Sequence, residues 1–452
     1  MKKNVFSLRI SNQHPQTVYL PFVFPSTSNL KEISFGTRVV ACNFVTDYLS
    51  DNTVTIGSEI SEELGLPFSA DVHIFLQDES IHIGPLIGIF TAGFTESPLR
   101  PIGERSLFFA NLLSSCYGAY IFVFGSHQIN WREGYISGYF YNEKRFVLHK
   151  VPFPHVVYDR LPNRKTENHR AIARVKSRLQ NEYLIPWFNP GFFNKWDVYR
   201  LLQHDPQASL YLPETALFHS FEQVELLLAK YKHIYMKPIN GSLGKSIYQI
   251  RYSTVQNEYY CRFRDEGGNK LRKYHSLEVL INHLLAQHDL HSFILQQGIS
   301  LLRIHGQPVD FRVHTNKDRN GAWKMSAIAA KVAGQGSMTT HINNGGDIKC
   351  MEDIFPNSDE RSQIIAKIQH ATLLLSEKID ERMDGYIGEI GFDIGIDLDH
   401  RIWLFEANSK PGRSIFDHPK LKQSDQLTKE LFLQYAIYLT KKTLLSPEEL
   451  FS

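Results

Sequence analysis

The sequence contains few cysteines, and they show no pattern. Its 452 residues include 4 cysteines, Cys42, Cys116, Cys261 and Cys350. They lie far apart and have none of the spacings typical of zinc sites or redox-active pairs. We therefore expect free thiols in a reducing compartment rather than a disulfide framework.

Long apolar segments and an excess of one charge are also missing. No apolar run approaches the ~20 residues that cross a bilayer. Met1-Lys2-Lys3 resembles the start of a signal peptide, but Arg9 and the polar Ser11-Asn12-Gln13 follow it. We expect neither an export signal nor a membrane span, and a cytoplasmic protein. The 49 Lys and Arg against 47 Asp and Glu leave a net charge of +2, which gives no argument for a nucleic-acid or membrane partner.

The composition is that of a folded protein with several domains. Apolar residues make up 42% and aromatic residues 12% of the chain, enough for buried cores. The length suggests roughly three domains at ~150 residues each. No internal repeat or low-complexity segment is visible. Residues 1–84 alternate short β-like runs with turns (18–24, 38–44, 53–56, 72–76 and 81–83), which predicts a small β-rich, barrel-like domain.

The next two regions have a different pattern. In residues 85–190, a buried strand at 86–94, a helix at 107–117 and a second strand at 119–124 predict a parallel α/β unit. We expect residues 152–164 to form an ordered connection. In residues 191–452 the first half favours helices at 195–203, 220–230 and 276–287 and strands at 233–238, 246–252 and 258–263.

A predicted hairpin at residues 388–412 carries an acidic cluster. Its first strand alternates acidic or glycine residues with apolar ones: Ile390, Phe392, Ile394, Ile396 and Leu398. An even-length loop centred on Asp399-His400 would place Asp393 opposite Glu406, with Asn408 on the same face. Two opposed carboxylates repel each other, whereas a hard cation such as Mg²⁺ between them would stabilise them. A surface hairpin with solvated acids is the alternative.

A second hairpin and a glycine loop suit phosphate groups. Asn320-Gly321 favours a type I′ turn, which would pair Asp310 with Lys331 and put Arg312 on the same face. A simple cross-strand ion pair is the structural alternative. The loop at 240–246 follows a strand ending in Lys237, and its glycines let the backbone approach a polyphosphate. It is not a P-loop, because Ile239 occupies the position of the first glycine and because a P-loop is followed by a helix, whereas this sequence predicts a strand there. A glycine turn with solvated lysines is the alternative here.

In this order, the stretches resemble the ATP-grasp superfamily from about Phe193 to the end of the chain. Within it the chain looks most like the YheC/YheD group, described as endospore-coat-associated proteins. The matching motifs are Asn194-Lys195-Trp196, Leu212-Pro213-Glu214-Thr215, Lys237-Pro238, the loop Gly241 to Lys245, Leu295 to Ile299, Val309 to Val313, Asn343-Asn344-Gly345-Gly346, and Asp393 with Glu406 and Asn408.

The resemblance implies a multidomain α+β and α/β protein. An ATP-grasp fold of two α+β halves would follow the β-rich domain and a pre-ATP-grasp α/β domain. ATP would lie between the halves, and a carboxylate would be phosphorylated and then captured by an amine. The implied metal ligands are Asp393, Glu406 and Asn408. The implied nucleotide-binding residues are Lys195, Lys237, Gly241, Ser242, Gly244, Lys245, Gln296, Gln297, Gly298, Ile299 and Asp310, and those at the transferring phosphoryl group are Arg312, Lys331 and Asn344.

Two other functions stay open. One is a coat-associated scaffold that binds nucleotide without turnover; the other is phosphoryl transfer to a different acceptor. The resemblance implies small carboxylate and amine substrates and spore coat proteins as partners. The chain departs from the superfamily at Gln296 or Gln297, where Glu is common, at Lys331, where Arg is more usual, and at His341, where Asn is frequent. Four arginines are candidates for a carboxylate-binding pocket, with Arg413 the best placed: Arg160, Arg164, Arg303 and Arg413.

Overall fold

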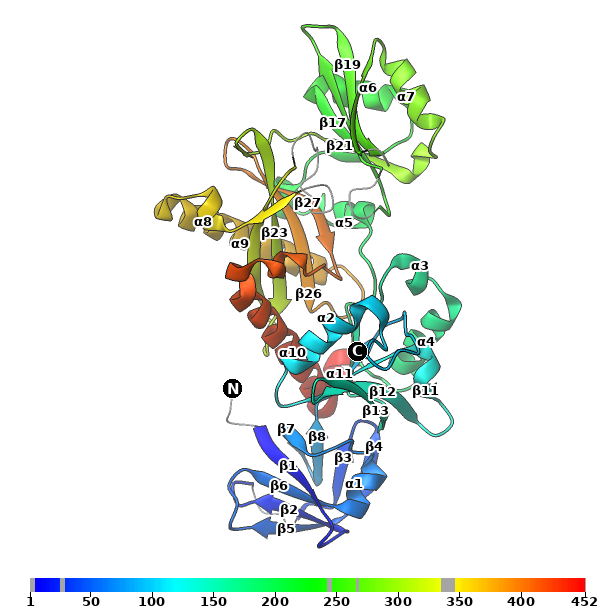
Figure 1. The fold of residues 1–452 in the computed structure, drawn as a ribbon, viewed down its shortest axis with the longest axis vertical. Coiled ribbons are helices and arrows are strands. Elements are labelled where there is room, and N and C mark those ends of the chain that lie inside the picture. Colours follow the sequence, from blue (N-terminus) through cyan, green and yellow to red (C-terminus); the bar gives the residue numbers. More distant parts are fainter. Residues whose placement is uncertain (1–4, 25–28, 242–245, 266–267, 335–345, 452) are drawn as a thin grey trace.

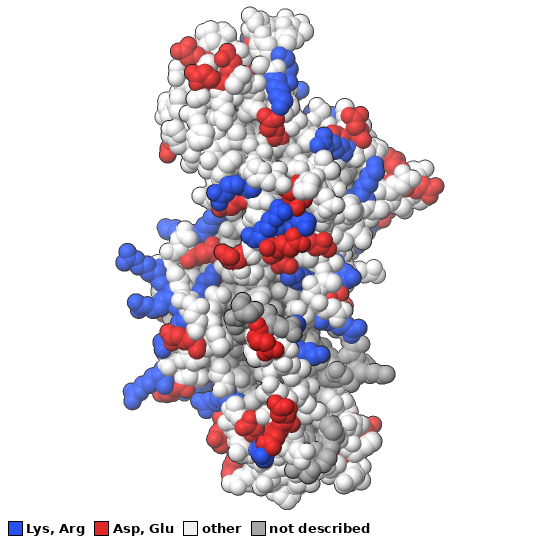
Figure 2. All heavy atoms as spheres, turned by 180° about the vertical axis from the view of Figure 1, so that it is seen from behind, with Lys and Arg blue, Asp and Glu red and all other residues white. Residues whose placement is uncertain are grey.

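The described strands form four sheets, numbered by their order in the sequence, and along the long axis of the molecule the fourth lies between the second and the third (Figure 1). The computed structural model describes residues 5–24, 29–241, 246–265, 268–334 and 346–451. In this part of the chain the four cysteines are free, as predicted. No helix within these ranges is both long and apolar enough to cross a membrane. Basic and acidic side chains are interspersed on the face seen in Figure 2, in keeping with the small net charge.

The first sheet confirms a β-rich N-terminal region. Its eight strands have the order β4-β3-β8-β7-β1-β6-β2-β5, and among the described residues its end strands β4 and β5 do not pair, so hydrogen bonds do not close it into a barrel. The sequence patterns missed β1, β3 and one helix, α1. The bounds are β1 (Val5–Ser11), β2 (Thr17–Pro21), β3 (Glu32–Phe35), β4 (Arg38–Ala41), β5 (Asn43–Asp47), β6 (Thr53–Gly57), α1 (Ser58–Leu64), β7 (Ala70–Gln77) and β8 (Ser80–Gly84).

The second sheet contains the predicted parallel unit. β9 (Leu86–Phe90) and β10 (Tyr120–Phe124) are parallel and are connected through α2 (Ser106–Ser114). The expected connection at 152–164 is instead partly a strand, β14 (Val156–Asp159), which pairs in parallel with β9. It escaped notice because it is short and lies between prolines. The other elements are β11 (Ile129–Asn130), β12 (Tyr135–Asn142), β13 (Arg145–Pro152), α3 (Arg164–Glu167), α4 (Arg170–Asn181) and β15 (Trp187–Phe188). The domain boundaries at 84/85 and 190/191 stay predictions.

The third sheet has one apolar and one polar face. On β17, Ile234 and Met236 are buried in an apolar core shared with helices α6 and α7. The alternate residues His233, Tyr235 and Lys237 therefore point to the other face, where they line a cavity. The order is β16-β21-β17-β18-β19-β20. The bounds are α5 (Lys195–Leu202), β16 (Thr215–Leu217), α6 (Phe221–Tyr231), β17 (His233–Pro238), β18 (Tyr248–Ser253), β19 (Glu258–Asp265), β20 (Gly268–Tyr274), α7 (Leu277–Leu285) and β21 (Phe293–Gln297).

The fourth sheet has the order β25-β24-β23-β26-β27 and packs against long helices. Helix α9 shares an apolar core with this sheet. Helix α10 contacts β23 and β24 of this sheet and shares an apolar core with the second sheet, so it joins the two parts of the molecule. The bounds are β22 (Arg303–Ile304), β23 (Gln307–Lys317), β24 (Trp323–Val332), β25 (Asp347–Lys349), α8 (Met351–Ile354), α9 (Ser358–Asp380), β26 (Glu389–Ile396), β27 (Ile402–Asn408), α10 (Lys422–Leu445) and α11 (Glu448–Phe451).

Both predicted hairpins have the expected central pairs but different turns. Asp310 pairs with Lys331 as predicted. Nearer the turn, however, Lys317 pairs with Trp323, one residue away from the predicted register, because the pairing shifts between His314 and Thr315. Asp393 likewise pairs with Glu406, although Ile396 pairs with Ile402 and the loop at 397–401 has an odd length.

The turn predictions failed because side-chain carboxylates organise the loops. The Oδ1 atom of Asp318 accepts hydrogen bonds from the backbone N–H groups of Asn320 and Ala322, and Gly321, but not Asn320, has a positive φ, so the turn is not type I′. In the same way Asp397 caps the second loop. Leu398, expected in the strand, lies in that loop with 68% of its surface exposed.

Candidate functional site

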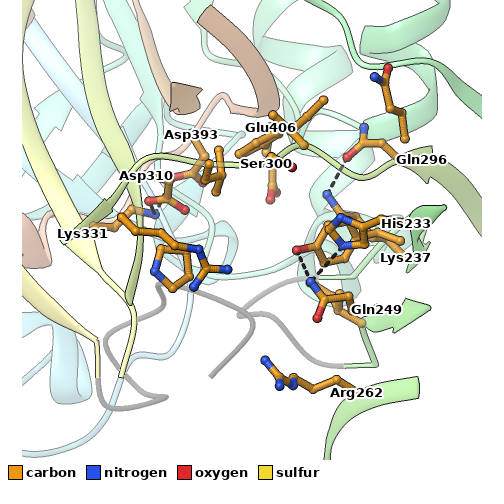
Figure 3. A pocket seen from close by; sticks show the side chains of 18 of the residues that line it. His233, Lys237, Gln249, Arg262, Gln296, Ser300, Asp310, Lys331, Asp393 and Glu406 are labelled. Carbon is orange, nitrogen blue, oxygen red and sulfur yellow. Dashed lines mark hydrogen bonds and ion pairs between the residues drawn. The ribbon is translucent and has the colours of Figure 1, made fainter. Parts of the chain in front are cut away.

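A cavity of about 510 Å³ lies between the third and fourth sheets, a size typical of small-molecule sites (Figure 3). Figure 3 shows Asp310, Lys331 and Asp393 at one side and His233, Lys237 and Gln249 at the other. The predicted site residues that line it are Lys195, Lys237, Gln296, Gln297, Ile299, Asp310, Lys331, Asp393 and Glu406.

The acidic end of the cavity is a compact ion cluster on one face of the fourth sheet. Asp393 accepts hydrogen bonds from Arg312 Nε at 3.0 Å and Nη2 at 2.9 Å, and from Lys331 Nζ at 2.7 Å. Lys331 Nζ also lies 3.0 Å from Asp310 Oδ1. Burial acts to raise the pKa of Asp393, but Arg312 and Lys331 outweigh it and hold this pKa well below its usual range. Asp393 is therefore ionised and fixed in position.

The oxygen atoms at this end form a donor set suited to a hard cation. Asp393 and Glu406 are direct cross-strand partners, and both line the cavity. Asn408 lies two residues after Glu406 on the same face of β27, where it pairs with Gly391, and it does not itself line the cavity. Carboxylate and amide oxygens are the ligands that Mg²⁺ prefers. The three residues that were predicted to hold a metal thus lie on two paired strands and carry oxygen atoms of the type that Mg²⁺ prefers; that they bind a metal stays a prediction.

Lys237 provides a cation at the opposite side. Its Nζ donates to Gln296 Oε1 at 2.6 Å, and Gln296 Nε2 in turn donates to Thr215 Oγ1 at 3.1 Å. This chain fixes the orientation of the Gln296 amide. Burial lowers the pKa of Lys237 to about 8, although Glu406 acts in the opposite direction.

The start of the glycine loop is tied to the helix that opens the third region. Lys195 Nζ donates to the carbonyl of Gly241 at 2.6 Å and lies 3.3 Å from Glu406 Oε1. Asn194 caps helix α5 and also donates to the Asn240 side chain at 3.0 Å. Ser242, Gly244, Lys245 and Asn344, four predicted site residues, lie outside the described residues.

The segment at 296–299, where strand β21 ends, packs closely against its neighbours in the third sheet. Gln297 makes two hydrogen bonds with Glu214: the Gln297 N–H donates to the Glu214 carbonyl at 2.8 Å, and Gln297 Oε1 accepts from the Glu214 N–H at 3.1 Å. A Cβ atom at Gly298 would lie 2.4 Å from the His233 ring, so only glycine fits there. These contacts therefore fix the position of the end of β21 beside the cavity.

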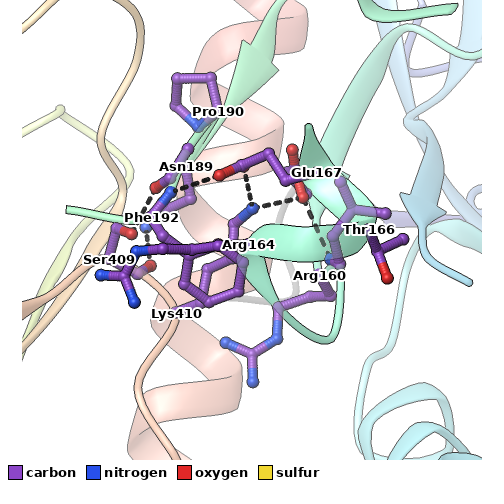
Figure 4. Close-up of polar contacts among 12 residues, drawn as sticks. Arg160, Arg164, Thr166, Glu167, Asn189, Pro190, Phe192, Ser409 and Lys410 are labelled. Carbon is purple, nitrogen blue, oxygen red and sulfur yellow. Dashed lines mark hydrogen bonds and ion pairs between the residues drawn. The ribbon is translucent and has the colours of Figure 1, made fainter. Parts of the chain in front are cut away.

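The loop after β27 is anchored to the second sheet (Figure 4). Lys410 Nζ lies 2.7 Å from Asp159 and 3.1 Å from Glu167. Asn189 donates to the carbonyl of Glu389 at 2.7 Å and accepts from the N–H of Gly388 at 2.9 Å. These contacts fix β26 and β27, and with them Asp393 and Glu406. The partners are more than 190 residues apart in sequence, so local patterns gave no sign of them.

Sequence reasoning missed the basic end of the cavity. His233, Gln249, Arg251 and Arg262 line it together with Arg303. The alternation in the strands at 233–238 and 246–252 was the available signal, because it places His233, Gln249 and Arg251 on the face opposite the apolar core. Among the other arginines singled out, Arg164 donates to the carbonyl of Asn240 at 3.4 Å, at the start of the glycine loop. Arg160 and Arg413 do not line the cavity.

Comparison with known proteins gives consistent matches. The model of a family described as "YheC/D like ATP-grasp" matches residues 184–439. The endospore coat-associated protein YheD of Bacillus subtilis (strain 168) is 42% identical over 463 aligned residues, covering 100% of this chain and 99% of that protein. The endospore coat-associated protein YheC of the same organism is 23% identical over 282 residues, covering 62% of this chain and 76% of YheC.

Comparison with solved structures gives a more distant likeness. D-alanyl-alanine synthetase A from Vibrio cholerae aligns with 80% of this chain and 99% of its own, with a TM-score of 0.44 and 12% identity. VanG D-Ala:D-Ser ligase from Enterococcus faecalis aligns with 78% of this chain and 99% of its own, with a TM-score of 0.44 and 13% identity. These likenesses are too coarse to assign a role to any residue.

Proposed function

Because this chain belongs to the YheC/D-like ATP-grasp family, we propose that it is an ATP- and Mg²⁺-dependent ligase that joins a carboxylate to an amine. The observation that best supports this proposal is the convergence of acids and lysines from two sheets on one cavity. Asp393, Glu406 and Lys331 reach it from the fourth sheet and Lys237 from the third. Opposite charges arranged in this way suit a metal–triphosphate complex.

Each residue then has a defined task. Asp393, Glu406 and Asn408 would hold Mg²⁺, which neutralises charge on the phosphate oxygens. Lys237 would contact the phosphates from the other side, with Gln296 to Ile299 against the base. Arg312 and Lys331, fixed by Asp393, would stabilise the transferring phosphoryl group. Asp310 holds the Lys331 ammonium in place. The glycine loop from Gly241, with Ser242, Gly244 and Lys245, would cover the triphosphate, and Asn344 would act with Arg312 and Lys331 at the transferring phosphoryl group.

The proposed reaction has two steps. A carboxylate oxygen attacks the γ-phosphorus, and the bond to the β,γ-bridging oxygen breaks, so that ADP leaves and an acyl phosphate forms. An amine nitrogen then attacks the acyl carbon, phosphate leaves with the bonding electron pair, and the amine loses a proton. The cations of the cavity stabilise the negative charge that develops in each step.

ATP consumption across a substrate panel tests the function. We expect the full chain to release ADP and phosphate in the presence of Mg²⁺ and ATP, and we expect amino acids or peptides to stimulate that release. Mass spectrometry of the products should show condensation with loss of water. Stimulated release without any condensed product would instead support phosphoryl transfer to another acceptor.

A second candidate function is favoured by the names of the relatives, which are described as endospore coat-associated proteins. In that case the chain would bind nucleotide and spore coat proteins without ligase turnover, and for either function we propose association with the endospore coat. Mg²⁺-dependent nucleotide binding without turnover on any substrate of the panel would favour this scaffold over the ligase.

The low pKa of Lys237 predicts a pH dependence of nucleotide binding. Above its pKa of about 8 the side chain becomes neutral and loses its attraction for phosphate. ATP affinity should therefore fall as pH rises through 8 to 9.5, by up to about tenfold per unit, because each unit of pKa corresponds to 1.36 kcal/mol. Titration calorimetry at several pH values measures this. In Lys237→Arg, whose guanidinium stays charged, the dependence should nearly disappear; an equally steep decline there would rule out Lys237 as its cause.

A further inference from the structure

A second group of charged side chains is buried between the second and fourth sheets, outside the cavity. Arg160 follows strand β14, Glu389 begins β26, and Arg413 follows the loop after β27. Their side chains are 8%, 2% and 9% exposed. In Figure 4 the guanidinium of Arg160 extends away from the network around Lys410. These three residues are called the Arg160–Arg413 cluster below.

One carboxylate is shared by both guanidinium groups of the cluster. Glu389 Oε2 accepts hydrogen bonds from Tyr158 Oη at 2.9 Å and from Arg413 Nη2 at 3.2 Å. Its other oxygen, Oε1, is 3.7 Å from Arg160 Nη1. Arg160 Nη2 donates to the carbonyl of Pro411 at 3.3 Å. Glu389 therefore satisfies only part of the hydrogen-bonding capacity of the two arginines.

Several buried polar atoms here lack a hydrogen-bond partner among the described residues. They are Arg160 Nε, Arg413 Nε and Nη1, Glu389 Oε1, and both ring nitrogens of His314. A buried donor or acceptor without a partner is costly, and native proteins satisfy most such groups with protein, water or ligand. His314 is fully buried, and burial together with Arg312, Arg413 and Arg160 lowers its pKa well below the ordinary value, so the ring is neutral.

Positive charge is in excess around these atoms. Arg105 donates to the carbonyl of Arg160, and burial together with the Arg160 charge lowers its pKa to about 10. Lys429 is paired with Asp425 at 2.6 Å, and Asp425 lies 3.8 Å from Arg413 Nη1. Asp159, which also acts on Arg105, is already paired with Lys410 and Lys176. Glu389 and Asp425 are thus shared by Arg160, Arg413 and Lys429, and Arg105 beside Arg160 adds a further cation. A buried excess charge of this kind is costly unless an anion accompanies it.

We propose that the Arg160–Arg413 cluster binds a carboxylate of the substrate other than the one that is phosphorylated, so that the enzyme acts on a compound with two carboxylates. This inference rests on the ligase function proposed above. Arginine guanidinium groups match carboxylates with paired hydrogen bonds, and the free Nε and Nη atoms provide the donors. The half-buried Phe108 lies over both guanidinium groups, at 5.2 and 5.9 Å, and covers the cluster on the side of helix α2.

The sheet sets the distance between the two anion positions. Asp393 and Glu389 lie on the same face of β26, four residues apart, which is about 13 Å at ~3.3 Å per residue. On β23, His314 lies on that face between them, in register with Gly391, and Arg312 lies level with Asp393. The two carboxylates of the substrate must therefore be several carbon atoms apart.

A series of dicarboxylates tests the proposal and measures this spacing. Glutarate, adipate, pimelate, suberate and azelate are titrated by calorimetry into the full chain at constant ionic strength, with Mg²⁺ and the β,γ-imido analogue of ATP. The monocarboxylates from pentanoate to nonanoate serve as controls of equal chain length. We expect at least one dicarboxylate to bind ten or more times more tightly than its monocarboxylate. If none does, the unsatisfied atoms are served by internal water and the proposal is overturned.

Variants locate the effect. Arg160→Met and Arg413→Met should abolish the preference for the dicarboxylate, whereas Arg319→Met, at an exposed turn, should keep it. Melting curves establish that each variant folds. Where a methionine variant does not fold, the corresponding arginine-to-lysine variant is used instead. Lysine keeps the positive charge but cannot make the paired hydrogen bonds of a guanidinium group, so the preference for the dicarboxylate should fall at least threefold. A preference that persists in both arginine variants also overturns the proposal.

The same titrations separate this inference from the ligase proposal. The arginine variants should bind the ATP analogue with wild-type affinity, since neither arginine lines the nucleotide cavity. Loss of the dicarboxylate preference with intact nucleotide binding supports the cluster as the anion site. Failure of the wild-type chain to bind the ATP analogue would contradict the ligase function, while the dicarboxylate titration without nucleotide still tests the cluster.

Discussion

Replacing Glu406 by Gln should weaken nucleotide binding at least about tenfold in the presence of Mg²⁺ and change it little in its absence. The substitution keeps the shape of the side chain but removes a negative charge from the oxygen cluster. Loss of even an outer partner of a bound metal costs 10–100-fold in affinity or activity, so loss of a direct ligand should cost at least as much. Titration calorimetry with ATP, with and without Mg²⁺, measures both quantities.

The fold should tolerate this substitution, which makes the test specific. Glu406 is 27% exposed and its ion pair with Lys195 spans 3.3 Å. Ion pairs that reach solvent contribute about 0–1 kcal/mol, so the melting temperature should change by a few degrees at most. Equal affinity of Glu406→Gln and the wild type for Mg·ATP would remove Glu406 from the metal site.

Replacing Asp393 by Asn should instead destabilise the protein strongly. Asp393 is the shared partner of Arg312 and Lys331, and all three side chains are at most 17% exposed. Removing one partner of a buried ion pair leaves an uncompensated charge, at a cost of about 3–5 kcal/mol. With a shift of about 2–4 °C per kcal/mol for a domain of this size, we expect the melting temperature to fall by about 10 °C.

A double variant distinguishes charge imbalance from altered packing. Arg312 pairs with Asp393 through two hydrogen bonds, whereas Lys331 also pairs with Asp310, so Asp393→Asn combined with Arg312→Met removes the cation that lost its partner. The double variant should melt at a higher temperature than Asp393→Asn alone. If it melts lower, by the sum of the two single effects, the ion cluster does not stabilise the sheet in the way described.

The central pairs of the site followed from the sequence, but partly for the wrong reason. Alternating side chains and turn positions correctly predicted that Asp393 faces Glu406 and Asp310 faces Lys331. The assumed even-length turns are absent, and in each hairpin a bulge restores the register. Bulges leave little trace in a single sequence, because they depend on how a strand fits its neighbours. The predicted register therefore holds on the side of each bulge away from the turn and is off by one residue on the turn side.

Interactions between distant segments could not be predicted. Strand β14 has only four residues, and its role depends on its parallel pairing with β9. Arg413 was singled out because it follows the Asp–Glu–Asn cluster, but its contact with Glu389 and the nearby Arg160 emerge only when the second and fourth sheets pack together. Local patterns contain periodicity and turn signals, whereas such contacts are decided by tertiary packing.

A crystal structure of the full chain with Mg²⁺ and the β,γ-imido analogue of ATP would test the central claim most directly. The account predicts the triphosphate between Lys237 and the fourth sheet, with Mg²⁺ bound by Asp393 and Glu406 at the short distances typical of oxygen ligands. Arg312 or Lys331 should contact the γ-phosphate. Nucleotide bound elsewhere, or in this cavity with its phosphates directed away from Asp393 and Glu406, would contradict it.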